Sequence, residues 1–103
     1  MDNFKIIYKI LKALEAAMDC DKLDHSLISA EFLGVSPNRW EAIMEMMCDE
    51  GYITGVTVIR GISMRGVKLS NVRITLRGLE FLEENSFMKK AANLAKGIAD
   101  IIP

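Results

Sequence analysis

Three observations predict a mainly helical α+β fold, a winged helix-turn-helix with an additional C-terminal helix. Apolar residues in the first half of the chain recur with a helical period. Two capped helices are separated only by residues 34–36, which predicts a helix-turn-helix. From Tyr52 the period changes to two, as in β-strands, before a helical pattern returns. We therefore assign residues 1–85 to this domain and residues 86–103 to a C-terminal helical extension.

Residues 3–19 form the first predicted helix. Its apolar side chains recur at i, i+3, i+4 and i+7 spacing, which gives one face directed at the core. A second apolar group widens that face, so we expect this helix to pack on two sides. The first group is Phe4, Ile7, Tyr8, Leu11, Leu14 and Met18, and the second is Ile6, Ile10, Ala13 and Ala17.

The helix-turn-helix is predicted from its start and stop signals. Residues 19–24 are polar and predict a loop, and residues 27–28 are assigned a short extended segment. Ser29 fits the N-cap of a short helix at 30–33, and Gly34 fits its C-terminal end. Ser36 and Pro37 begin a second helix, because proline at the first helical position lacks only a donor that the helix does not use. This helix ends at Gly51. The side chains that it directs toward the core are those of Trp40, Ile43, Met44 and Met47.

A hairpin and two helices complete the expected order. β-branched residues at 52–59 predict a strand, and residues 67–69 and 72–74 alternate as its returning partner. Gly61 and Gly66 bracket the loop between them. Thr75 fits the N-cap of a helix at 76–84, in which Leu79 and Leu82 point inward beside Phe81. A final helix is predicted at 87–102. Its apolar residues fall in one row along the helix, namely Phe87, Ala91, Leu94, Ile98 and Ile101.

The composition is that of one ordinary folded domain. The 103 residues are 50% hydrophobic and 26% charged and include two prolines, which excludes a disordered chain. Cys20 and Cys48 lie far apart without CxxC spacing, so neither a disulfide framework nor a zinc site is predicted. The sequence has no run of 18 apolar residues and no secretory signal pattern. We therefore expect a cytoplasmic protein without a membrane partner.

Two stretches of the sequence resemble known regulators. Gly34-Val35-Ser36, followed by Trp40 and then by Asp49-Glu50-Gly51-Tyr52-Ile53, resembles the helix-turn-helix and first strand of winged-helix regulators. The sequence ITLRGLEFL at residues 74–82 resembles the LT-x-x-G-x-x-x-L step from wing to helix in the same proteins. With the additional helix, nearly the whole chain resembles the YjcQ family of small bacterial and prophage-associated proteins. This resemblance implies a winged-helix fold and, through that fold, DNA binding, without catalytic residues to carry over.

The order of the charges is informative, although the net charge is only −1. Residues 1–50 sum to −5, residues 51–79 to +5 without a single acid, and residues 80–103 to −1. An acid-free stretch of cations predicts a local positive surface whatever the net charge is. The alternative interpretation is a solvated hairpin whose basic residues have no function. The five cations are Arg60, Arg65, Lys68, Arg73 and Arg77.

These charges predict a site for duplex DNA at the start of the second motif helix and on the hairpin. Asn38 and Arg39 carry donors that match base edges in the major groove. The hairpin cations Arg60, Arg65, Lys68 and Arg73 suit phosphates or a minor groove, and the lack of interleaved aromatic residues favours duplex over single strands. The same helix also carries acids that repel phosphates, so we expect contact only through its first turn. These acids are Glu41, Glu45, Asp49 and Glu50.

Neither a catalytic site nor a cofactor or metal site is predicted. His25 lacks partner ligands and is expected on a surface loop, and both cysteines are expected to be small buried hydrophobes. The serines lack a nucleophile-elbow pattern, and the glycines lack the spacing of phosphate-binding loops. We therefore expect neither an enzyme nor a small-molecule substrate.

Two hypotheses of function stay open from the sequence. The first is a DNA-binding transcriptional regulator of bacterial or prophage origin. The second is a winged helix used as a protein-interaction module, such as a phage-encoded adaptor or inhibitor, because its acidic helix suits a basic partner. A homodimer through the first and C-terminal helices is also predicted, because both have more apolar surface than one partner would cover. The alternative is a monomer in which the last helix folds back on the first.

Overall fold

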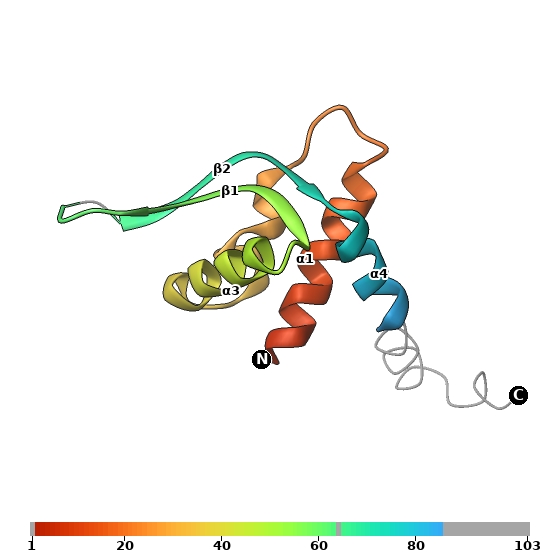
Figure 1. The fold of residues 1–103 in the computed structure, drawn as a ribbon, viewed down its shortest axis with the longest axis horizontal. Helices are drawn as coiled ribbons and strands as arrows, with labels where there is room; N and C mark the ends of the chain where they lie inside the picture. Colours follow the sequence, from red (N-terminus) through yellow and green to blue (C-terminus); the bar gives the residue numbers. More distant parts are fainter. Residues whose placement is uncertain (1, 64, 86–103) are drawn as a thin grey trace, which may run out of the picture.

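The structure confirms a mainly helical α+β fold with one antiparallel hairpin (Figure 1). This computed structural model describes residues 2–63 and 65–85, so the helix predicted at 87–102 lies outside the described residues. Within them, no helix is both long and apolar enough to cross a bilayer. The elements are α1 (Asn3–Ala17), the 3-10 helix η1 (His25–Ile28), α2 (Ala30–Leu33), α3 (Pro37–Asp49), β1 (Ile53–Arg60), β2 (Arg65–Ile74) and α4 (Leu76–Glu84).

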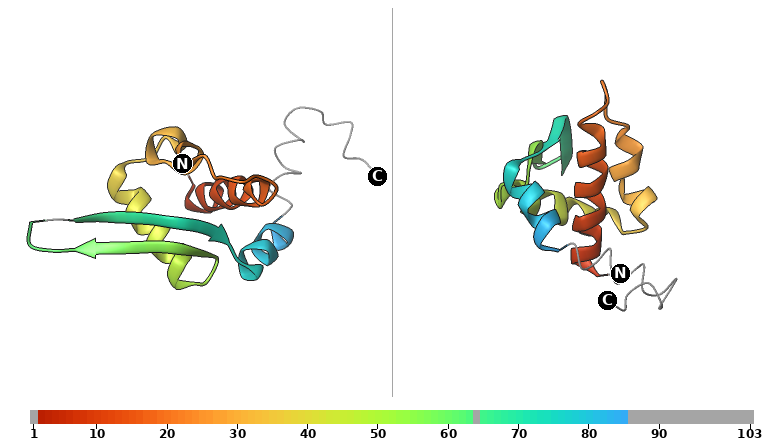
Figure 2. Two further views of the ribbon diagram at one scale, coloured as in Figure 1. Left: turned by 90° about the horizontal axis from the view of Figure 1, so that it is seen from above. Right: turned by 90° about the vertical axis from the view of Figure 1, so that its right-hand side faces the viewer.

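Helix α1 runs through the middle of the molecule. It lies between η1 and α2 on one side and α4 with the base of the hairpin on the other (Figure 2). The prediction that Phe4 and Met18 face the core is wrong, because their side chains are 58% and 63% exposed. The buried face combines both apolar groups, since Ile6 and Ile10 of the second and Leu11 of the first are fully buried. The buried residues of α1 are Ile6, Ile7, Ile10, Leu11 and Leu14.

The segment predicted to be extended, Leu27 and Ile28, is a turn of 3-10 helix instead. The Asp24 carboxylate accepts hydrogen bonds from Ser26 Oγ at 2.6 Å and from Ser26 N at 3.0 Å, and these bonds lower the pKa of Asp24. The N–H of Leu27 then donates to Asp24 O at 3.1 Å. Such local bonds offer the backbone an alternative to strand pairing. The described part of the chain therefore forms a sheet of two strands.

The caps predicted for α2 and α3 are confirmed. Ser29 Oγ accepts a hydrogen bond from Phe32 N at 3.1 Å, and Ser36 Oγ accepts one from Arg39 N at 3.2 Å. Gly34 ends α2 with a φ of 72°, a left-handed conformation in which a side chain would be strained. These local bonds fix the short turn between the two helices.

Trp40 holds α3 against the segment that precedes α2. Its indole Nε1 donates to Ile28 O at 2.7 Å, which satisfies both groups in a half-buried position. The rest of the predicted core face of α3 is confirmed, since Ile43, Met44 and Met47 are at most 1% exposed. The position of α3 relative to η1 is therefore supported by one hydrogen bond and by the core.

The returning strand is continuous rather than divided into two segments. β2 pairs with β1 from Ile53–Ile74 at the base to Arg60–Arg65 near the tip, so the predicted loop is shorter than the interval between the two glycines. The register shifts between Thr54 and Val56, at Gly55, whose φ is +87°. This irregularity lets β2 keep pairing on both sides of the shift, whereas the sequence pattern shows only a break in alternation.

Thr75 connects the start of α4 to the corner between α3 and β1. Its Oγ1 accepts a hydrogen bond from Gly78 N at 3.1 Å, which confirms it as the N-cap. The same hydroxyl donates to Gly51 O, and the Thr75 N–H donates to Tyr52 O at 3.0 Å. One residue therefore orients α4 relative to the hairpin.

We expect Thr75→Val to lower the free energy of unfolding by about 1.5–3 kcal/mol, because it removes an N-cap and a second hydrogen bond while keeping the shape of the side chain. Urea unfolding followed by circular dichroism measures the loss. Thr57→Val is the matched control, because Thr57 is exposed on β1; its expected change is within about 0.5 kcal/mol. Equal losses in the two variants would contradict the role given to Thr75.

Candidate nucleic-acid interface

The first turn of α3 places Asn38 and Arg39 at the surface. Both residues are exposed, as a contact with DNA requires. Arg39 Nη1 donates to Asn3 Oδ1 at 3.2 Å. The Arg39 side chain is therefore directed along the surface toward the start of α1. The Arg39 guanidinium would have to give up this hydrogen bond to Asn3 in order to contact a base.

One face of the hairpin is turned toward α3. Val56, Val58 and Arg60 alternate along β1 and therefore share this face. Cys48 Sγ on α3 lies 3.7 Å from Val56 O, and Val56 packs against the core. α3 consequently runs beside the hairpin, and the side chain of Arg60 reaches the helix.

Arg60 forms an ion pair with Glu45 of α3. Arg60 Nη2 lies 2.6 Å from Glu45 Oε1, and the two side chains are 70% and 29% exposed. Glu41 and Asp49 lie one helical turn before and after Glu45, and we call these three residues the acidic edge of α3. A negative charge thus stands between the start of α3 and the cation of the hairpin. Arg39 and Arg60 are therefore separated by an acidic side chain of α3.

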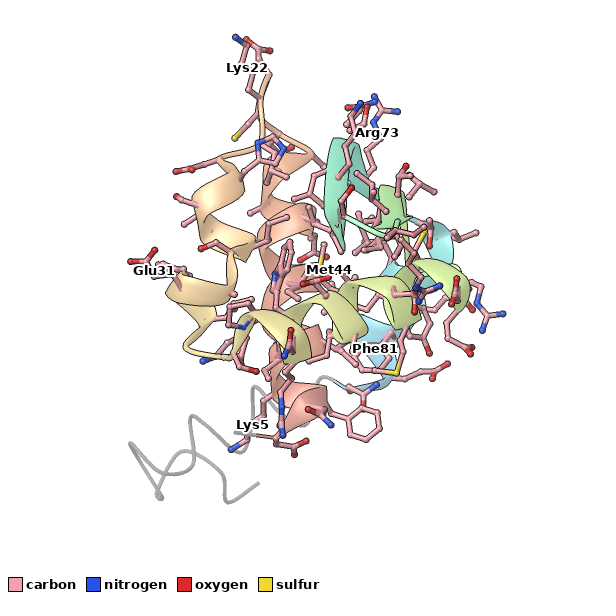
Figure 3. The ribbon with its side chains drawn as sticks, turned by 90° about the vertical axis from the view of Figure 1, so that its left-hand side faces the viewer. Lys5, Lys22, Glu31, Met44, Arg73 and Phe81 are labelled. Carbon is pink, nitrogen blue, oxygen red and sulfur yellow. The ribbon has the colours of Figure 1, made fainter. Side chains whose placement is uncertain are left out.

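The other predicted hairpin cations point elsewhere or lie at the base. Lys68 is opposite Thr57 in the register, so it lies on the face turned away from α3, where it is exposed. Arg73 is opposite Thr54, and Figure 3 shows it with Lys22 at one end of the molecule and Lys5 at the other. Arg65 opens β2 opposite Arg60 in the register, and its side chain lies outside the described part of the structure. The five predicted residues whose side chains the structure describes therefore do not form one continuous surface.

A row of lysines on α1 was missed by the interpretation of the sequence. Lys5, Lys9 and Lys12 are exposed at i, i+4 and i+7 spacing, which places them on one side of the helix. This spacing is visible in the sequence and could have identified the row. Lys12 Nζ lies 2.9 Å from Glu15 Oε1, and this hydrogen bond raises the pKa of Lys12. α1 therefore presents a mainly basic face to solvent.

The burial of α1 within one chain removes part of the support for the predicted homodimer. That prediction relied on a second apolar face in α1, but Ile6 and Ile10 are fully buried in the core of the same chain. They are therefore not available to a second helix. The homodimer stays a prediction, and its other support, the apolar seam of residues 87–101, lies outside the described residues.

The titratable residues outside this interface, as far as the structure describes them, are scattered over several elements. No cluster of three or more histidine, cysteine or acidic side chains suited to a metal ion occurs in residues 2–63 and 65–85. Cys48 is half-buried, but the prediction that Cys20 is buried is wrong. Cys20 is exposed because α1 ends at Ala17, so it lies in the turn beyond the helix. His25 is exposed on η1.

Comparison with known families identifies the chain. The model of a family described as YjcQ protein matches residues 8–101. The chain belongs to the YjcQ family. This confirms the resemblance noted in the sequence. No curated protein and no solved structure matches this YjcQ family member significantly. Family membership does not by itself assign a role to a residue.

Proposed function

We propose that this YjcQ family member is a winged-helix DNA-binding module, a bacterial or prophage transcriptional regulator. In this proposal α3 is the recognition helix and the β1–β2 hairpin is the wing. The order of α2, turn, α3 and hairpin supports it, and α3 lies beside the hairpin (Figure 1). The observation that carries the proposal is a hairpin without acids whose cations Arg60, Lys68 and Arg73 are exposed.

The acidic edge determines how duplex DNA is bound in this proposal. Insertion of the whole of α3 into a groove brings three carboxylates close to phosphates, which repel them. Contact through Asn38 in the first turn and through the wing avoids most of that repulsion. Arg60 must leave Glu45 to bind a phosphate, and an exposed ion pair is worth only about 0–1 kcal/mol, so this exchange costs little.

Titration of random duplex DNA with the full chain at several salt concentrations tests the proposal. We expect a dissociation constant of about 10⁻⁶ to 10⁻⁴ M at low salt, the range typical of sequence-independent binding. If three to five cations contact phosphates, the slope of log affinity against log salt is roughly −3 to −4.5. Absence of binding in this range at low salt overturns the proposal.

The double variant Arg60→Ala/Arg65→Ala tests the role of the wing. We expect weaker binding to every duplex sequence and a salt slope that is flatter by about two units, because two phosphate contacts are removed. Loss of the exposed Arg60–Glu45 ion pair should change stability little. Lys5→Ala/Lys9→Ala removes the same charge from α1 and is the matched control. If the control flattens the slope equally, net charge and not the wing governs binding.

A second candidate function is supported by the acidic edge itself. Glu41, Glu45 and Asp49 form a row on the helix that a winged-helix protein would present to DNA. Such a row suits a basic protein surface, and the chain is then an interaction module such as a phage-encoded adaptor or inhibitor. Both proposals describe a binding protein without catalysis. The salt titration distinguishes them, because the interaction module does not bind duplex DNA at low salt.

A further inference from the structure

The tip of the β1–β2 hairpin carries a large apolar side chain that the described part of the chain does not cover. Ile62 lies in the turn between the two strands and is fully exposed to solvent. Every other exposed large apolar side chain in residues 2–63 and 65–85 is at most 74% exposed. Gly61 and Ser63 on either side of Ile62 are small and also exposed, so they do not shield it. Burial of Ile62 in a partner would therefore remove nearly its whole side chain from water.

The hairpin holds Ile62 away from the helices. Both Figure 1 and the left view of Figure 2 show the paired strands projecting past α3. The strands stay paired up to Arg60 and Arg65, so the base of the turn is fixed two residues before Ile62. Arg60 lies about 13 Å along β1 beyond Val56, whose carbonyl is close to Cys48 of α3. Ile62 follows Arg60 and can therefore enter a narrow space that the body of the protein cannot enter.

The charges of the hairpin indicate an anionic partner for this tip. Arg60 is 70% exposed, and residues 51–79 contain no acid. The minor groove of duplex DNA is lined by phosphates and is about 6 Å wide, so it admits one side chain more easily than two strands about 4.8 Å apart. An anionic membrane is less suitable, because even a myristoyl chain gives only marginal binding and one isoleucine side chain is much smaller. Duplex DNA is therefore the partner that the tip fits better.

We propose that Ile62 is an apolar wedge that enters the minor groove and partly separates two stacked base pairs, so that the protein bends the duplex it binds. This inference rests on the proposed DNA binding and adds the kind of duplex that is preferred. Apolar side chains inserted between base steps bend DNA in this way. Unstacking costs least at pyrimidine–purine steps such as TA, whereas A-tracts are stiff. The preferred ligand is therefore a duplex rich in TA steps.

Insertion of an arginine instead of Ile62 predicts the opposite preference. The narrow minor groove of an A-tract has an enhanced negative potential, which attracts an arginine side chain. Arg60 in the groove would therefore favour A-tracts, and Arg60 on a phosphate beside the groove favours neither duplex. The two modes of contact can be distinguished with duplexes of identical base composition.

Anisotropy titrations of the full chain with two labelled duplexes of equal length test the inference. One duplex alternates T and A, and the other is a continuous A-tract. We expect the alternating duplex to bind about fivefold or more tightly, because the wedge opens its steps at lower cost. Ile62→Ser should reduce this ratio to less than about twofold and leave the salt slope unchanged, since no charge is removed. Its melting temperature should stay unchanged, because the side chain is fully exposed.

Two further variants separate the wedge from general apolar character. Ile62→Leu keeps an apolar side chain at the tip and should keep the preference for TA steps. Leu76→Ser is the matched control, because Leu76 is 74% exposed but lies at the start of α4, at the other end of the hairpin. It should also keep the preference. Energy transfer between dyes at the two ends of the alternating duplex should rise with every protein except Ile62→Ser, because bending brings the ends closer.

The outcomes separate this inference from the proposed function. A preference for A-tracts, or a TA preference that Ile62→Ser leaves intact, overturns the wedge, and DNA binding itself then stands. Absence of binding to either duplex at low salt overturns both proposals. Vesicles of phosphatidylserine provide the last comparison. If they bind the unmodified chain but not Ile62→Ser, the tip is a membrane contact and the wedge is overturned.

Discussion

Gly55→Ala is expected to lower the free energy of unfolding by about 3 kcal/mol, because it combines backbone strain with a steric clash. Gly55 has a φ of +87°, which L side chains rarely adopt, and a Cβ atom there would lie 2.7 Å from Asn71 O. The atoms in the way belong to the backbone of β2 and cannot rotate aside. In a domain of this size the loss lowers the melting temperature by about 10–20 °C, as calorimetry would measure.

Gly66→Ala is the matched control for this prediction. Gly66 lies in β2 of the same hairpin, but a Cβ added there meets no atom within 4 Å, and its φ is outside the left-handed region. We expect a change within about 1 kcal/mol, because only the entropy of the unfolded chain is altered. A similar loss at both glycines would show that the hairpin is generally sensitive to substitution and would contradict the crowding described at Gly55.

Neutralising the acidic edge is expected to tighten binding to random duplex DNA by about tenfold to thirtyfold at low salt, since each exposed charge interaction is worth about 0.2–1 kcal/mol. The variant carries Glu41→Gln, Glu45→Gln and Asp49→Asn. It removes repulsion of phosphates along α3, and it releases Arg60 from its ion pair with Glu45. The salt slope should stay about the same, because Arg60 already contacts a phosphate when the unmodified chain binds DNA. Anisotropy of a labelled duplex measures both quantities.

The control for this variant changes net charge equally at a distance from α3. Glu31→Gln, Glu80→Gln and Glu83→Gln remove three exposed acids from α2 and α4. We expect less than threefold tightening, because screening by salt weakens distant charges. If both variants tighten binding to the same extent, the acidic edge is not close to the bound DNA.

The sequence predicted best those elements whose signals are local. Ser29, Ser36 and Thr75 each accept a hydrogen bond from an N–H three residues away, so the cap and its target lie in one short stretch. The prediction was wrong for Leu27 and Ile28, because their strand propensity competes with the bonds that Asp24 makes at the start of η1. The left-handed Gly55 was missed because the crowding arises from the partner strand, which the sequence does not position.

The candidate site was only partly predictable for the same reason. The sequence identified the cations of the hairpin and the acids of α3, but their pairing depends on how the hairpin packs against the helix. Glu45 and Arg60 are brought together by that packing, and Lys68 is turned to the other face by the register of the strands.

The position of Trp40 provides an internal optical probe. The chain has one tryptophan, and its indole donates to Ile28 O between α3 and η1. Its emission therefore reports on the contact between these two elements, whereas far-ultraviolet dichroism averages over all helices. Loss of this contact exposes the indole to water and shifts the emission to longer wavelengths. If the two signals separate during unfolding, the helical pair opens before the rest of the domain, and binding-induced changes in this region can be followed without an added label.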